Sequence, residues 1–300
     1  MAVYLGSDKV GVTKELGTDK LQWICDNVKN LQYAFQGYQG TSLDEVLIGL
    51  DTSKVGSFYY TFADCIYIVS IPYLDLSSVT SLSYTFYNCK LLETMPELDM
   101  QNMTRGCDST FRSCRKIETI NIKNLNSMTS LNYMFGECFK LKNLNLTNFD
   151  TSNVTSFSYT FYNCPELETI PPMNVIKGTS FTAMIGLCSK LKNLTLYNIK
   201  KTLQIGAGTS YGHLLTLDSL INTIKELWDL TGSTSQTLTM STPSKNLIAD
   251  VYIKLVEPTA EQIEADPNII YKKNCVVCES TDEGAMTLTE YATSKNWAIA

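Results

Sequence analysis

Six cysteines recur at nearly constant intervals through the middle of the chain, and this period constrains the fold more than any other feature. Successive members are separated by 24, 25, 24, 26 and 24 residues: Cys65, Cys89, Cys114, Cys138, Cys164 and Cys188. Self-similarity at one fixed period is the signature of tandem structural repeats. A unit of this length cannot bury its apolar side chains alone, but stacked units bury them together. The period therefore predicts a solenoid.

Apolar residues occupy fixed positions before each cysteine, and we number these positions by their distance from it. Position −3 is apolar in every unit: Phe62, Phe86, Phe111, Phe135, Phe161 and Ile185. So is position −7: Phe58, Leu82, Cys107, Leu131, Phe157 and Phe181. A degenerate first unit places Leu31, Phe35 and Tyr38 at the same offsets. This spacing predicts one apolar stripe on a short helix, and the Ser/Thr pairs before it, such as Thr80 and Ser81, predict N-caps.

After each cysteine the apolar period changes from helical to alternating. Leu144 and Leu146 flank the polar Asn145, which is the pattern of a half-buried strand. An acidic or amide residue then precedes the next unit and predicts a turn that satisfies backbone N–H groups locally: Asp51, Asp75, Asp99, Asn126 and Asp150. Residues 31–200 are therefore predicted to form about seven units of an α/β solenoid, with a parallel sheet on one side and short helices on the other.

The regular cysteines are predicted to be buried free thiols rather than disulfide partners. A small polarisable side chain suits a crowded interior position between phenylalanines, and single cysteines at one repeat position mark a structural column. The predicted repeat core comprises Phe62, Cys65, Phe86, Cys89, Phe111, Cys114, Phe135, Cys138, Phe161, Cys164 and Cys188.

The two flanking segments lack the cysteine period. Residues 1–30 are predicted to form a hairpin and a helix over 18–29, which cap the solenoid or attach it to a partner. Residues 201–300 are predicted to form a C-terminal α/β cap or small module. There we expect a loop over 201–212, a helix capped by Thr216 that ends at Gly232, and a further helix over 258–265. Strands are expected at 236–240, 251–255, 269–272 and 297–299.

Catalytic motifs are absent from the sequence. His213 is the single histidine and has no nucleophile motif beside it, so a packed or solvated role is favoured over catalysis. Cys275 and Cys278 form the single C-x-x-C motif without the second pair that structural zinc requires. The intervening valines indicate a buried strand, with a disulfide or a redox or metal role as alternatives. We therefore expect no enzyme activity, no cofactor and no metal.

Tyrosines recur on the opposite side of the predicted helical stripe, at positions −5 and −2. They are Tyr33, Tyr60, Tyr84, Tyr87, Tyr133, Tyr159 and Tyr162. Two interpretations remain open. The rings stack between repeats, or they form an aromatic binding strip. The exposed sheet face is predicted to be small, polar and nearly neutral, which suits glycan or protein contacts: Thr94, Thr119, Asn121, Asn143, Asn145 and Thr169.

Charge and hydropathy exclude several classes of partner. The net charge is −6 and no run of five basic residues occurs, so nucleic acid is not an expected partner. No apolar stretch approaches ~18 residues, so membrane insertion is not expected. The first residues lack the basic and apolar segments of a secretory signal peptide. The protein is therefore expected either to stay in the cytosol or to reach the outside by another route.

Several strings resemble the BspA-like leucine-rich repeats of the phenylalanine/cysteine variety. They are residues 84–89 (Tyr-Thr-Phe-Tyr-Asn-Cys), 133–138 (Tyr-Met-Phe-Gly-Glu-Cys) and 146–157 (Leu-Thr-Asn-Phe-Asp-Thr-Ser-Asn-Val-Thr-Ser-Phe). The resemblance covers roughly residues 31–200 and implies a leucine-rich-repeat solenoid. This family is mostly associated with bacterial surface proteins and adhesins, and similar repeats occur in phage tail proteins. Residues 1–10 and 288–297 also resemble the ends of such tail or fibre proteins of gut bacteria, with Asn296 where glycine is usual.

These observations favour a non-enzymatic binding protein. Its expected partners are a protein or glycan on a bacterial surface, and other virion proteins. A phage tail-associated structural or receptor-binding protein, located in the virion and assembled in the host cytoplasm, is the favoured hypothesis. A bacterial cell-surface adhesin is the first alternative, and an enzyme with its site in residues 201–300 is the second. The oligomeric state does not follow from the sequence.

Overall fold

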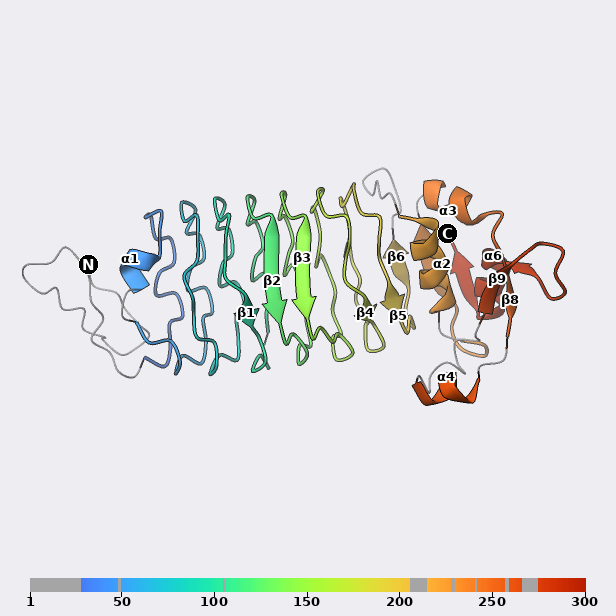
Figure 1. Ribbon diagram of the computed structural model, residues 1–300, viewed down its shortest axis with the longest axis horizontal. Helices are drawn as coiled ribbons and strands as arrows, with labels where there is room; N and C mark the ends of the chain where they lie inside the picture. Colours follow the sequence, from blue (N-terminus) through green and yellow to red (C-terminus); the bar gives the residue numbers. More distant parts are fainter. Residues whose placement is uncertain are drawn as a thin grey trace, which may run out of the picture.

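The protein is an elongated solenoid that ends in a small α/β module (Figure 1). The computed structural model describes residues 28–47, 50–104, 106–205, 215–227, 230–240, 242–256, 259–265 and 275–300. The predicted hairpin and most of the predicted helix within residues 1–30, His213, and the strand expected at 269–272 lie outside the described residues. We number the coils of the solenoid from 1, which contains Leu31, and from 2 to 7 by their cysteines, Cys65 to Cys188.

Short parallel strands lie one above another on one side of the coils. The solenoid elements are α1 (Asp44–Leu47), β1 (Leu98–Asp99), β2 (Thr119–Lys123), β3 (Asn143–Thr147), β4 (Met173–Asn174) and β5 (Leu196–Tyr197). The sheets run in the order β1-β2-β3 and β4-β5, all parallel. Ile120 pairs with Leu144, one repeat later. The predicted parallel solenoid is confirmed.

The predicted helix between positions −7 and 0 is wrong, because these residues form successive turns. Tyr84 and Asn88 have φ values of 58° and 60°, which no α-helix contains. The N–H of Thr85 bonds within its coil to the carbonyl of Leu82 at 3.0 Å, whereas the N–H of Phe86 donates to the next coil. In an α-helix every backbone N–H must find its carbonyl acceptor within the helix. Here the next coil supplies acceptors as well, so alternate N–H groups donate to that coil.

The hydroxyls predicted as N-caps have a different role for the same reason. The Thr80 hydroxyl donates to the carbonyl of Gly56, and that of Thr155 donates to the carbonyl of Thr129, both one coil earlier. The predicted acidic turns are present. Asp75 Oδ1 accepts the N–H of Ser77 at 2.8 Å, two residues on, which is the local bond expected of this residue type.

The core is built from columns that run the length of the solenoid. All six period cysteines and the phenylalanines at position −3 of coils 2 to 6 have 0–1% exposure. Phe86 and Phe111 stack at 5.6 Å between ring centroids, and the neighbouring pairs along the column stack at 5.6 and 6.1 Å. The six thiols are free and each donates to the position −3 carbonyl of the preceding coil at 3.0–3.2 Å. The predicted buried thiol column is confirmed.

A buried threonine column at position −4 was not predicted. Thr61, Thr85, Thr110 and Thr160 have 0% exposure, and each hydroxyl donates to a position −7 carbonyl of the coil before it. These bonds satisfy the hydroxyls without water, so the columns cross-link adjacent coils on the turn side.

The C-terminal module closes the solenoid with two three-stranded sheets. Its elements are β6 (Leu203–Ile205), α2 (Leu217–Lys225), β7 (Gln236–Met240), α3 (Thr242–Ile248), β8 (Tyr252–Leu255), α4 (Ala260–Ala265), β9 (Cys275–Cys278), β10 (Met286–Thr287), α6 (Leu288–Ser294) and β11 (Trp297–Ile299). One sheet has the parallel order β11-β7-β6 and the other the antiparallel order β10-β8-β9. A single apolar cluster continues from the coils into this module.

Most of the module follows the sequence pattern. The predicted strands β7 and β11 have the expected bounds, β8 begins one residue late, and α4 begins at Ala260. Thr216 accepts the N–H of Ser219 and caps α2, although the helix ends at Lys225, before Gly232. The expected loop over 201–212 contains β6, and α3 and α6 were missed. Asn296 has φ 63°, a left-handed conformation that asparagine tolerates, which explains why it can stand where glycine is usual.

Candidate binding surfaces

The tyrosines at position −5 form a stacked column along the turn side of the solenoid. Tyr33 and Tyr60 stack at 5.3 Å between centroids, Tyr60 and Tyr84 at 4.4 Å, and Tyr133 and Tyr159 at 4.4 Å with planes 2° apart. Each of these residues has φ between 53° and 59°, because the third of the four residues in each turn is left-handed. The column therefore lies on turns and not on the predicted helical face.

Arg112 fills the gap where the column is interrupted. Coil 4 has Ser109 at position −5, and the Arg112 guanidinium lies 4.0 Å from the Tyr133 ring centroid and 5.9 Å from that of Tyr87. It also donates to Glu137 Oε1 at 2.8 Å. Partial burial opposes ionisation of Glu137, but hydrogen bonds from Ser113 and Arg112 outweigh it and lower the pKa of the carboxyl.

The column is partly open to solvent. Tyr33 is 51% exposed and the other six predicted tyrosines are half-buried. Tyr87 and Tyr162 at position −2 contact Tyr84 and Tyr159 edge-on. Burial, with smaller contributions from neighbouring tyrosines, raises the pKa of Tyr60 to about 12. Tyr59 joins the cluster edge-on to Tyr60 and was not predicted, because it lies outside the −5 and −2 positions.

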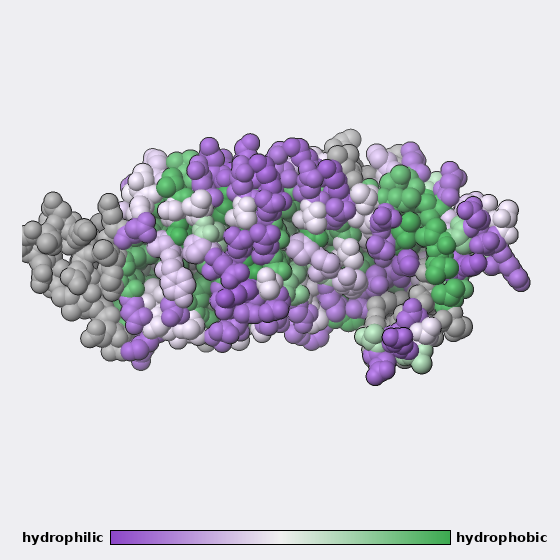
Figure 2. Space-filling view, viewed as in Figure 1, coloured by the Kyte–Doolittle hydropathy of each residue, from purple (hydrophilic) through white to green (hydrophobic). Residues whose placement is uncertain are grey.

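The sheet face carries polar side chains in ladders, as predicted for Asn121, Asn143, Asn145 and Thr169. Asn145 Nδ2 donates to Asn121 Oδ1 at 2.8 Å, and Asn143 Nδ2 donates to Thr119 Oγ1 at 3.3 Å. The viewed face of the solenoid, which carries β2 and β3, is mainly hydrophilic (Figure 2). Such small amide and hydroxyl groups offer hydrogen-bonding capacity with little net charge.

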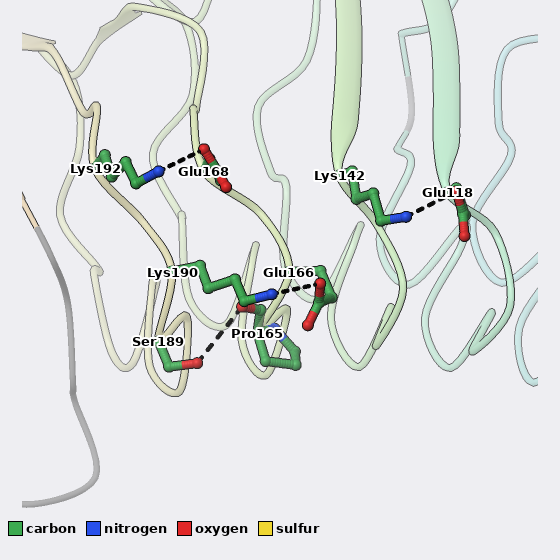
Figure 3. A network of polar contacts seen from close by, with 8 residues as sticks. All are labelled: Glu118, Lys142, Pro165, Glu166, Glu168, Ser189, Lys190 and Lys192. Carbon is green, nitrogen blue, oxygen red and sulfur yellow. Dashed lines mark hydrogen bonds and ion pairs between the residues drawn. The ribbon is translucent and has the colours of Figure 1, made fainter.

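Ion pairs between neighbouring coils lie beside these ladders, but none joins coil 5 to coil 6 among the described residues. Lys142 pairs with Glu118 at 3.0 Å, and Lys192 pairs with Glu168 at 2.8 Å (Figure 3). Lys190 pairs with Glu166 at 2.8 Å. In the part of the chain that the structure describes, no ion pair or backbone hydrogen bond joins 139–149 to 165–173.

A polar cleft opens at this interruption. It has a volume of about 650 Å³ and is lined by Lys142, Asn143, Leu144, Asn145, Glu166, Glu168, Thr169, Pro171 and Lys190. Lys142 and the two asparagines come from coil 5, whereas Glu168, Thr169 and Pro171 come from coil 6. The sequence pointed to the polar face but not to the cleft. The signal in the sequence is Pro171, which stands at position +7 of coil 6 directly after a coil with Asn145 at that position.

The C-x-x-C motif forms the predicted strand, but the strand is not buried. Cys275–Cys278 is β9, an edge strand paired with β8 alone. Val276 and Val277 are 40% and 57% exposed, and Cys278 is a half-buried free thiol. The expectation of a buried strand is wrong because Val276 and Val277, which point to opposite faces of the strand, are both exposed. Among the described residues, no group of three or more His, Cys, Asp or Glu side chains is arranged to hold a metal ion.

Comparison with known protein families identifies the family of the repeats. The model described as the BspA type leucine rich repeat region (6 copies) matches residues 31–168 and residues 83–213, which together cover more than half of the chain. The chain belongs to the BspA-type leucine-rich-repeat family. No curated protein and no solved structure matches it.

Membership of the BspA-type family makes this chain a repeat binding scaffold with a protein-binding type of surface. Proteins of this repeat family are typically non-enzymatic. None of the helices in the described part of the chain combines the length and hydrophobicity needed to cross a bilayer.

Proposed function

We propose that this BspA-type protein is a non-catalytic, phage tail-associated component of the virion that binds a protein or glycan on a bacterial surface. The tyrosine column, continued by Arg112, is the proposed protein-contact strip. The resemblance of residues 1–10 and 288–297 to the ends of tail or fibre proteins supports the virion location. The same surface would serve a bacterial adhesin. Tail or portal genes next to the coding sequence would support the virion proposal, and their absence would favour the adhesin.

The observation that carries the binding role is the packing of the partly exposed rings against each other. Stacking holds Tyr84, Tyr133 and Tyr159 in fixed orientations before any partner arrives. Fixed aromatic side chains lose little conformational entropy on binding, and tyrosine combines an apolar ring with a polar hydroxyl. Stacking between repeats and contact with a partner are therefore compatible roles for these residues.

Replacement of Tyr84, Tyr133 and Tyr159 by serine tests the strip. The fold already accepts serine at this position, because Ser109 occupies it in coil 4 with φ 55°. We expect binding of the labelled protein to intact gut-bacterial cells, measured by flow cytometry, to fall about tenfold or more, as expected when central aromatic contacts are lost.

A matched control replaces three exposed tyrosines outside the column, namely Tyr67, Tyr73 and Tyr197, which are 43%, 78% and 37% exposed. The control should bind as the native protein does. Thermal unfolding of both variants separates loss of contact from loss of stability. Equal cell binding by the column variant, the control and the native protein would refute the contact role.

A further inference from the structure

The cleft between coils 5 and 6 has a cause that the sequence and register identify. Position +7 is Asn121, Asn145 and Pro171 in coils 4, 5 and 6. Ile122 pairs with Leu146 at the same repeat position, whereas Met173 at position +9 pairs with Leu196 at position +8. Coil 6 therefore carries one extra residue around Pro171, which is a bulge, and proline cannot donate to a neighbouring strand. Among the described residues, no strand pairing joins β3 to coil 6.

Hydrogen-bonding groups are left without a neighbour on the wall formed by coil 5. Asn145 donates its amide to Asn121, but Pro171 stands where the next amide would donate to Asn145 Oδ1. Asn143 likewise donates backwards to Thr119, while Thr169 accepts from Asn193 on the far side. Among the described residues, Asn143 Oδ1 and Asn145 Oδ1 receive no hydrogen bond.

Of the four charged residues that line the cleft, Glu166 and Lys190 pair with each other, and the other two pair with residues outside it. Lys142 pairs with Glu118 in coil 4, and Glu168 pairs with Lys192 in coil 7 (Figure 3). Each keeps capacity for another bond, because an ammonium has three donors and a carboxylate has two acceptor oxygens. The lining contains two lysines and two glutamates, so its formal charge cancels.

We propose that this cleft binds a neutral oligosaccharide. Its volume lies within the ~300–1,000 Å³ range of small-ligand sites. Hydroxyl groups both donate and accept, so adjacent sugar hydroxyls can bond to amide oxygens, carboxylates and the Lys142 ammonium together. A strongly anionic or cationic ligand gains nothing from cancelling charges. The inference rests on the proposed binding function and supplies its glycan site.

An extended peptide is a weaker match to the same walls. A peptide that adds to a sheet edge gains affinity from main-chain hydrogen bonds and specificity from pockets for alternate side chains. Here Leu144 and Pro171 are the sole apolar residues among the nine that line the cleft. The other seven present polar groups, which favours the polyhydroxylated ligand.

The test uses the full chain on an array of neutral oligosaccharides, sulfated or sialylated oligosaccharides, and unstructured peptides, followed by calorimetric titration of any ligand found. The cleft variant is Lys142→Gln with Glu168→Gln. Its matched control is Lys123→Gln with Glu97→Gln, two residues on the same sheet face that pair at 3.3 Å and are about as exposed as Lys142 and Glu168. Both variants alter exposed side chains, so the fold is retained.

We expect binding to members of the neutral group, a loss of affinity of about tenfold or more in the cleft variant, and an affinity within about twofold of native in the control. Binding to the anionic glycans or peptides alone, equal effects of both variants, or no binding to any oligosaccharide would overturn the proposal. If cell binding still depends on the tyrosine column, the proposed function stands although the cleft proposal fails. If the protein binds neither an oligosaccharide nor cells through the tyrosine column, the proposed function is refuted as well.

Discussion

Replacement of Cys138 tests whether the thiol column is held by hydrogen bonds as well as by packing. Cys138 is fully buried, and its Sγ lies 3.1 Å from the carbonyl oxygen of Phe111. That oxygen also accepts the N–H of Cys114 at 3.1 Å, so it keeps one donor when the thiol is removed. Cys138→Ala should therefore cost mainly the lost sulfur contacts and a small cavity, about 1–2 kcal/mol.

Cys138→Ser separates the two contributions. A buried hydroxyl without a partner costs roughly 1–3 kcal/mol, and a typical hydrogen bond returns about 0.5–1.5 kcal/mol. Because the Phe111 carbonyl is in place as an acceptor, we expect Cys138→Ser to unfold within about 1 kcal/mol of Cys138→Ala. From the sequence alone, with no acceptor known, the serine would be expected to be clearly worse.

The assay is urea unfolding followed by circular dichroism, with midpoints compared at constant slope. Cys278→Ser is the control, since its half-buried thiol lies on β9 outside the column and should change stability by no more than about 0.5 kcal/mol. A serine variant that is less stable than the alanine variant by roughly 2 kcal/mol or more would show that the Phe111 carbonyl does not accept the hydroxyl.

Two further predictions follow from buried or partly buried ionisable groups. Burial raises the pKa of Cys65 and of Cys188 to about 12, whereas unfolded thiols titrate near ~8.5. The contribution of these thiols to the free energy of unfolding is therefore fully present below the unfolded pKa of ~8.5 and is lost as pH rises towards 12. Urea midpoints should accordingly fall above pH ~8.5. A thiol reagent at that pH should leave the native column unlabelled, and labelling of native Cys65 or Cys188 would contradict the burial. Arg112→Lys should lower stability by about 1 kcal/mol in thermal unfolding, because lysine keeps the charge but loses the planar contact with Tyr133. Arg112→Gln should cost at least as much, and a lysine variant as stable as the native protein would show that charge alone matters.

The solenoid and its buried columns could be predicted from the sequence because both depend on period. Cys114 and Phe111 recur at fixed offsets, and any stacking of equal units buries such positions together. The local conformation could not be predicted in the same way. Positions −7, −3 and 0 match a helix, but they match a run of turns equally well when the next coil accepts alternate N–H groups. That choice depends on contacts between units, which a period-based argument does not contain.

The candidate sites also contain features that follow the repeat period and could be predicted, and features that depend on contacts between coils and could not. The tyrosine positions were visible as a column, whereas Arg112 was found only because coil 4 lacks a tyrosine at Ser109 and the guanidinium lies across the gap. The cleft was missed because it arises from an irregularity, the bulge at Pro171, and a consensus repeat averages such features away. Cys275–Cys278 shows that an alternating apolar run specifies a strand but not whether another layer covers it.

The direction of the bonds between coils bears on how the chain is made. The N–H groups of Tyr84, Phe86 and Asn88 donate forward to coil 4, whereas the Cys89 thiol and Thr85 hydroxyl donate back to coil 2. During synthesis a completed coil can dock at once on the one before it, and it then presents a row of unpaired amides to the segment leaving the ribosome. Each coil thus serves as a template for its successor, so the solenoid can grow in step with translation, from the amino end.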